Sequence, residues 1–212
     1  MSSKRSYVSP LREQAAARTR ALILQRATDL FADHGYGRVT VRDIAEAAGV
    51  ASKTVFASVG SKSDILDRIV DRGVTDSGYD EAMRQILSTP SPETALGTLA
   101  AGTRAGNEGQ WAVHQAIFKA LPVHEDGEAL WRRATGDYRR ALGLAARHLH
   151  TLAPPPEYSV TETAELLWYW FGPTGWRTLV VENGWSWGRA EDVLRDTALA
   201  ALYPGGRAAA TR

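Results

Sequence analysis

Apolar residues recur at helical spacing through most of the 212-residue chain, and this pattern predicts an all-α protein. The first such run covers residues 11–33, where Ile23, Ala27 and Leu30 fall on one face. Gly35 follows directly and is suited to the left-handed conformation that ends a helix. We therefore expect a long first helix that stops just before Gly35.

The next stretch divides into two short helices around a glycine. Thr40 is placed to cap the first of them, with Asp43 three residues later as the partner of an approximate capping box. Gly49 is suited to a sharp left-handed turn, and the second helix begins at Ala51 or is capped by Ser52. The expected apolar faces are Ile44, Ala45 and Ala48 on the first helix, and Val55, Phe56 and Val59 on the second. The pattern predicts a helix-turn-helix, which places its second helix in a DNA major groove, although an ordinary helical hairpin has the same pattern.

The flanks of this stretch favour the first interpretation. Residues 15–66 resemble the DNA-binding domain of the tetracycline-repressor (TetR) family of bacterial transcription regulators. The matching residues are Ile23, Ala27, Leu30, Phe31, Gly35, Tyr36, Thr40, Ile44, Ala45, Ala48, Gly49, Val50, Thr54, Phe56, Lys62 and Leu66. The resemblance implies an amino-terminal three-helix helix-turn-helix domain followed by a helical ligand-binding and dimerisation domain.

The resemblance also implies which side chains contact DNA. The expected DNA-binding residues are Thr40, Arg42, Ser52, Lys53, Thr54, Phe56, Ala57 and Lys62. Thr40 and Arg42 open the supporting helix, where backbone N–H groups and the helix dipole favour phosphate. The first turns of the recognition helix face base edges, and Lys62 matches a phosphate-binding lysine of the family.

The recognition helix departs from the common family pattern. Family members often have Tyr-x-Tyr-Phe where this chain has Phe56-Ala-Ser-Val59, so two tyrosine hydroxyls are missing. Each lost phosphate contact should weaken binding at every DNA sequence alike. The change leaves open a protein of the same fold with weakened or lost DNA recognition.

Charge is distributed unevenly along the chain. Residues 1–62 hold ten Lys/Arg against five Asp/Glu, a balance of +5, whereas residues 63–212 have a balance of −4. A basic first part attached to an acidic remainder is typical of a protein in which only the first part meets phosphate. The alternative explanation of this difference is random variation in surface charge along the chain. We expect residues 1–12 to form a basic flexible arm and residues 205–212 a disordered tail.

After the helix-turn-helix, the sequence predicts a connecting segment and a second domain. The expected divisions are a helix-turn-helix domain over 13–62, a connecting helix and linker over 63–92, and a ligand-binding and dimerisation domain over 93–204. Within the last of these we expect helices over 94–105, 110–121, 128–152, 160–184 and 190–203, with a turn at 106–109. Pro173 must kink or break its helix, because it lacks a backbone donor.

Aromatic residues suggest a ligand pocket in this second domain. Our candidate ligand-binding residues are Trp111, His114, Phe118, Trp131, Tyr138 and Trp168. Plain core packing explains the same pattern and is the favoured alternative. Five of the seven tryptophans lie between residues 168 and 187. One helix cannot bury so many tryptophans against a single core. In the family the last two helices pair in a homodimer, which this region fits.

Several other classes of function find no support in the sequence. The chain has no cysteine, which excludes disulfides, zinc–thiolate sites and cysteine catalysis. We find no nucleophile elbow, phosphate loop or helical zinc-protease motif, and therefore expect no enzyme, no catalytic residue and no cofactor. His148 and His150 point about 160° apart on a helix and cannot share a metal ion. No apolar run approaches the ~20 residues of a membrane span, and no signal peptide is evident, so we expect a cytoplasmic protein.

These features together predict a ligand-responsive, DNA-binding transcriptional regulator. We expect a homodimer on an inverted-repeat operator of double-stranded DNA, released by a small apolar or aromatic inducer. The residues do not distinguish a repressor from an activator, and repression is the favoured mode. The alternative is a dimeric small-molecule-binding protein of the same fold.

Overall fold

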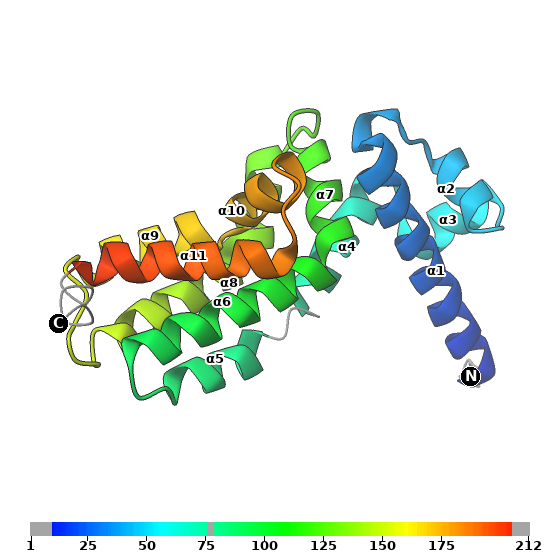
Figure 1. The fold of residues 1–212 in the computed structure, drawn as a ribbon. Coiled ribbons are helices and arrows are strands. Elements are labelled where there is room, and N and C mark those ends of the chain that lie inside the picture. The colour runs from blue at the N-terminus through cyan, green and yellow to red at the C-terminus, as the bar shows by residue number, and fades with distance from the viewer. Residues whose placement is uncertain (1–9, 76–78, 205–212) are drawn as a thin grey trace. The chain divides into compact units, whose positions relative to one another are not determined.

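The computed structural model describes residues 10–75 and 79–204, and every regular element in these ranges is a helix (Figure 1). The described chain forms two compact units. The first contains the residues up to Gly73 together with Ala112–Trp131, and the second contains Val74–Trp111 and the residues from Arg132 onward. Most of the expected amino-terminal arm and the whole expected tail after Pro204 lie outside the described residues.

The first unit is built around three helices that pack on one another. Its elements are α1 (Pro10–His34), the 3-10 turn η1 (Tyr36–Arg38), α2 (Val41–Ala47), α3 (Ser52–Val59), most of α4 (Lys62–Thr75), most of α7 (Trp111–Ala120) and the start of α8 (Gly127–Leu149). Ile23, Ile44 and Val55 are fully buried where α1, α2 and α3 meet. The predicted three-helix helix-turn-helix arrangement is confirmed.

Local signals explain how these helices begin and end. Gly35 has φ 85° and Gly49 has φ 65°, so both adopt the left-handed backbone that the sequence predicted. The Thr40 hydroxyl accepts from the Asp43 N–H at 3.2 Å, and the Thr40 N–H donates to Asp43 Oδ2 at 2.8 Å. The capping box of α2 is therefore confirmed.

Of the two starts expected for α3, the cap at Ser52 is wrong, because Ala51 occupies the cap position without a side-chain hydrogen bond and Ser52 is the first helical residue. Phe56 is not part of the apolar face and is 55% exposed. Val55 and Val59, four residues apart, fill the interior side of this short helix, and Phe56 lies one helical step away from them.

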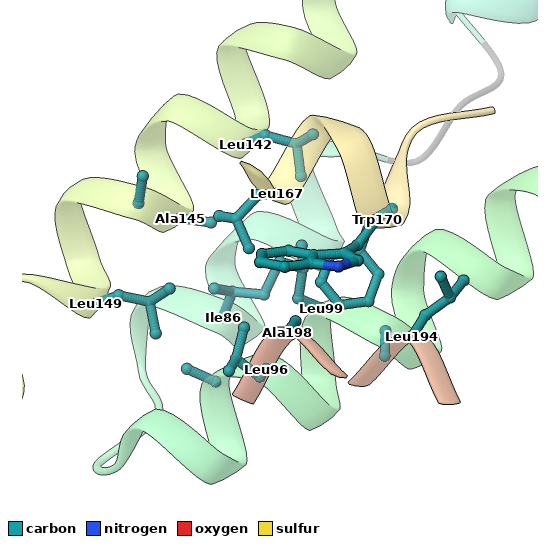
Figure 2. Close-up of a cluster of buried hydrophobic side chains, with 14 of the residues drawn as sticks. Ile86, Leu96, Leu99, Leu142, Ala145, Leu149, Leu167, Trp170, Leu194 and Ala198 are labelled. Atoms are coloured by element: carbon teal, nitrogen blue, oxygen red, sulfur yellow. The ribbon is translucent and has the colours of Figure 1, made fainter. Parts of the chain in front are cut away.

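The second unit is a helical bundle. Its elements are α5 (Tyr79–Leu87), α6 (Pro92–Gly109), most of α8, α9 (Val160–Phe171), α10 (Pro173–Arg177), the π-helical turn η2 (Thr178–Glu182) and α11 (Trp187–Leu202). Apolar side chains from α5, α6, α8, α9 and α11 converge in one core, in which Trp170 lies among leucines and alanines (Figure 2).

Several element boundaries in this unit differ from the prediction. The connecting segment expected over 63–92 contains most of α4, which is described as far as Thr75, and α5, which is described from Tyr79. The expected turn at 106–109 is wrong, since α6 continues through Gly109. Asn107 in this segment is fully buried, and its Nδ2 donates to Thr103 O at 2.8 Å and to Tyr138 Oη at 3.1 Å. These hydrogen bonds, one within α6 and one to α8, outweigh the tendency of Gly106-Asn107 to form a turn.

Two helix boundaries near the carboxyl end follow from capping and proline. Ser159 and Glu162 form a capping box at the start of α9, and α9 ends at Phe171 before Pro173, as expected. The last helix, α11, begins at Trp187 rather than at the expected residue 190, because the Ser186 hydroxyl accepts from Arg189 N–H and starts the helix earlier.

The break between α9 and α10 requires glycine. A Cβ at Gly172 would lie 2.4 Å from Trp168 O, whereas a Cβ at Gly97 in α6 would meet nothing within 4 Å. We expect Gly172→Ala to destabilise the second unit by about 1–3 kcal/mol through overpacking. Gly97→Ala, the matched control, should stabilise it by about 0.5–1 kcal/mol, since alanine favours the helix. Urea unfolding followed by circular dichroism measures both, and equal effects of the two substitutions would contradict this account.

Candidate nucleic-acid interface and ligand-binding core

The recognition helix α3 presents one face to the surrounding solution. Lys53, Phe56 and Ala57 are exposed and lie at helical spacing i, i+3 and i+4, on the side away from the buried Val55 and Val59. The structure therefore brings three of the predicted DNA-binding residues onto one surface. The other two DNA-binding residues predicted on this helix are partly buried; they are Ser52 and Thr54.

At the start of α2, the carboxylate of Asp43 accepts hydrogen bonds from the cap residue, Thr40. The Asp43 Oδ2 atom accepts from both the N–H and the hydroxyl of Thr40, each at 2.8 Å. These hydrogen bonds lower the pKa of Asp43, so the carboxylate is ionised at neutral pH. The Thr40 hydroxyl thus serves the capping box, and Arg42, two residues further along, is exposed.

Lys62 has a structural role that the sequence did not reveal. Its Nζ donates to Tyr36 O at 3.0 Å and to Val39 O at 3.1 Å, and lies 4.3 Å from the centroid of the Tyr36 ring. One ammonium group therefore fixes the turn that precedes α2 and sets the place of Thr40. The predicted phosphate contact of Lys62 requires the same group.

The segment 112–131 also contacts this corner of the first unit, which comprises the end of α1, the turn before α2 and the start of α4. Lys119 Nζ donates to Ala32 O and to Asp33 O, the last carbonyls of α1. His124 Nε2 forms a hydrogen bond with Ser63 Oγ at 3.1 Å, and its ring packs against Tyr36 at a centroid distance of 5.4 Å. Sequence reasoning missed these contacts, which join residues about 60 to 90 positions apart, because no local pattern signals them.

The six predicted ligand-binding residues separate into smaller groups. In the first unit Phe118 packs on Trp131, with ring centroids 5.2 Å apart. In the second unit Tyr138 meets Trp168 edge to face at 5.7 Å. Trp111, in the same unit, meets Trp187 edge to face at 5.6 Å. Each group supplies an aromatic wall, and a common ligand site remains a prediction.

His114, the sixth of these residues, is partly buried, and its Nδ1 atom is shielded from solvent. Burial lowers its pKa to about 4, and its Nδ1 has no hydrogen-bond partner within the described residues. Neutral imidazole is the form that an apolar environment favours. The side chain can therefore accept or donate a hydrogen bond without carrying charge.

The tryptophans between 168 and 187 are largely accommodated within the chain itself. Trp170 and Trp176 are buried in the core of the second unit. Trp168 lies under the Arg139 guanidinium, and Trp185 under that of Arg189, each at 4.0 Å. The number of tryptophans therefore does not by itself require a second surface.

The two histidines near the end of α8 face different partners. His148 Nε2 bonds to the Thr89 hydroxyl at 3.1 Å, whereas His150 Nε2 bonds to the Thr163 hydroxyl at 3.2 Å. Across the described ranges no three His, Cys, Asp or Glu side chains are grouped to hold a metal ion. None of the helices in those ranges combines the length and apolar character of a membrane span.

Comparison with known proteins is consistent with the geometry of the first unit. Residues 23–69 match the family described as bacterial regulatory proteins, tetR family. The chain is 35% identical over 109 residues to the HTH-type transcriptional repressor KstR2 of Rhodococcus jostii (strain RHA1), which covers 50% of this chain and 53% of that protein. The match thus spans about half the length of this curated relative.

Solved structures share the fold over nearly the whole chain. The fatty acid degradation regulator FadR of Bacillus halodurans superposes with a TM-score of 0.71 at 15% identity, covering 87% of this chain and 96% of that one. FadR of Bacillus subtilis, solved in complex with stearoyl-CoA, superposes with a TM-score of 0.70 at 13% identity, covering 86% and 99%. At such identities the likeness establishes the all-helical, two-part fold.

The Lys62 contacts give a prediction about local stability. Lys62→Met removes two charge-assisted hydrogen bonds and should cost about 1–3 kcal/mol at the turn before α2. Amide hydrogen exchange of residues 36–47 should therefore quicken roughly tenfold or more. Lys53→Met, an equal loss of charge at an exposed position, should leave exchange there unchanged. Equal protection in the two variants would mean that Lys62 does not hold the turn.

His114 makes stability depend on pH. Because its pKa is about 4 in the folded protein and about 6.5 when unfolded, the unfolded chain takes up the proton first as pH falls. The wild-type protein should lose about 2 kcal/mol from this group between pH 7.5 and pH 5. Urea unfolding of wild type and His114→Leu at both pH values measures the difference. An identical loss in both proteins would contradict the assignment.

Proposed function

We propose that this chain, which belongs to the TetR family of bacterial transcription regulators, is a ligand-responsive repressor that binds an inverted-repeat operator as a homodimer. The observation that carries the proposal is the exposed face of α3, where Lys53, Phe56 and Ala57 lie together on a short helix held by a buried core. Repression as the mode of action is supported by the curated relative, which is named a transcriptional repressor.

The DNA contacts divide into positioning and reading. Arg42, near the turn before α2, is suited to a phosphate oxygen. Lys62 Nζ uses two of its three N–H donors on Tyr36 O and Val39 O, which leaves one for a phosphate oxygen. Lys53 reads guanine acceptors in the major groove, and the exposed ring of Phe56 contacts thymine methyl groups. Because Phe56 has no hydroxyl, this helix depends on Lys53 for polar contact more than a tyrosine-bearing helix would.

A dimer brings two such helices to one operator. The last two long helices, α9 and α11, form the expected dimer surface, and α9 carries Tyr169, which is 72% exposed, and Val160, which is 36% exposed. Large exposed apolar side chains on one element favour burial against a second copy. Two recognition helices related by a two-fold axis read half-sites about one DNA turn apart.

The inducer is a small apolar or aromatic molecule bound by the second unit. Tyr138, Trp168 and the neighbouring aromatic side chains supply the apolar contacts, and the complex of the Bacillus subtilis regulator with stearoyl-CoA, which has a long acyl chain, supports an apolar ligand. The ligand releases DNA only through a higher affinity for the dimer geometry that does not fit the operator.

Selection of DNA from a random-sequence pool tests this proposal. We expect a short inverted repeat whose binding falls steeply with salt, because phosphate contacts release counterions. Lys53→Ala should cost about 1–3 kcal/mol and relax the preference at one or two base pairs of each half-site. Fluorescence anisotropy with the selected duplex and its base-substituted forms measures both effects.

A matched control distinguishes the loss of a base contact in Lys53→Ala from a general effect of removing one positive charge. Arg84→Ala removes an exposed cation from α5, far along the chain from the recognition helix, and should leave operator affinity and sequence preference unchanged. If no sequence is enriched at low salt, the chain has lost DNA recognition. A small-molecule-binding protein of the same fold would then be the better description, as the small side chains at Ala57 and Ser58 would suggest.

A further inference from the structure

A buried amide in the second unit has an acceptor that the chain leaves unused. Asn107 on α6 is fully buried, and its Nδ2 donates to Thr103 O at 2.8 Å and Tyr138 Oη at 3.1 Å. Its Oδ1 has no hydrogen-bond partner within the described residues. The orientation of the amide is fixed, because a flip would set Oδ1 against the carbonyl oxygen of Thr103.

The hydrogen bonds that Asn107 does make are dispensable to its partners. Thr103 O lies four residues earlier in α6, so the backbone N–H of Asn107 already donates to it. The Tyr138 hydroxyl donates to Phe171 O, which keeps it bonded without the amide. An apolar side chain at position 107 would therefore leave neither partner unpaired, and would remove an unsatisfied buried acceptor.

Tyr138, which accepts a hydrogen bond from this amide, connects it to a group of aromatic side chains. Tyr138 contacts Trp168 edge to face, and Trp176 Nε1 donates at 3.1 Å to the same Phe171 carbonyl that Tyr138 binds. Trp176 in turn packs on Trp187 at 5.6 Å. The chain around them changes from α9 to the short α10 and then to the π-helical turn η2, an irregularity common at functional sites.

We propose that Asn107 Oδ1 accepts a hydrogen bond from the inducer, which is therefore a ring-bearing apolar molecule with a hydroxyl or N–H donor. The aromatic rings bind the apolar body, and the amide oxygen selects for the donor. A site with a buried acceptor rejects an analogue that lacks the donor, because the acceptor then stays unpaired in the complex. The inference rests on the proposed function, since it specifies the ligand of the same regulator.

The first test needs no ligand. Asn107→Leu keeps the shape of the side chain, and we expect its melting temperature to equal or exceed that of wild type. Thr103→Val, one turn earlier in α6, is the matched control, because it removes a buried hydroxyl that already donates to Ala100 O at 3.1 Å. A fall of several degrees in Asn107→Leu, beyond that of the control, would mean that Asn107 is kept for stability and would overturn the proposal.

The second test uses two pairs of probes that differ only in a donor. These are 2-naphthol with 2-methylnaphthalene, and indole with benzofuran. Equilibrium dialysis against the full chain should give an affinity at least about tenfold higher for the donor member of at least one pair. In Asn107→Leu the ratio should fall to about one, while in Thr103→Val it should stay as in wild type.

The outcomes separate this inference from the proposed function. An unchanged ratio in Asn107→Leu, or no binding of any of the four probes to wild type, would overturn the role of Asn107. If the same protein still selects an inverted repeat, the regulator proposal is unaffected. A donor preference that depends on Asn107, in a chain that selects no DNA, would retain the inference about the ligand and refute DNA binding.

Discussion

Lys62 Nζ donates to the carbonyls of Tyr36 and Val39, and the position of helix α2 depends on these two bonds. The turn between α1 and α2 has only three residues in η1, and it buries the side chains of Tyr36 and Val39. A cation that bonds the carbonyls of these two residues and also lies on the Tyr36 ring adds to that packing. Where α2 lies then determines where the helix-turn-helix presents α3.

The same corner receives support from residues far along the chain. Lys119 binds the final carbonyls of α1, where the helix dipole favours a cation, and His124 contacts both Ser63 and Tyr36. Residues 112–131 therefore belong to the same compact unit as the helix-turn-helix, although the chain reaches them from α6 and leaves them for α8 of the second unit. The chain thus passes between the units near Gly73, Trp111 and Trp131.

Local chemistry accounts for what the sequence predicts well. The capping boxes at Thr40 and Ser159, the left-handed turns at Gly35 and Gly49, and the break before Pro173 each depend on residues within four positions of one another. Signals of this kind need only neighbouring residues, so the sequence alone contains them. The spacing of Ile23 and Ala27 likewise identifies the buried face of α1, since burial follows the helical period.

Contacts between distant residues account for what the sequence did not predict. A glycine and an asparagine indicated a turn at 106–109, but Asn107 bonds to Tyr138, 31 residues away, and α6 continues. Phe56 follows the apolar pattern yet lies on the exposed face of α3. Lys62 was assigned to phosphate by its position, whereas its internal bonds to Tyr36 and Val39 depend on the folded arrangement. The residues expected to face DNA come from the sequence pattern, whereas the contacts that support their helices are found only in the structure.

The most direct measurement of the central claim is native mass spectrometry of the full chain on the selected duplex and on a duplex with one half-site destroyed. The account predicts two chains on the intact inverted repeat, and weaker binding when one half-site is lost, since the second recognition helix then has no target. A chain that stays free of DNA would contradict it, as would a graded series of bound copies that is the same on both duplexes.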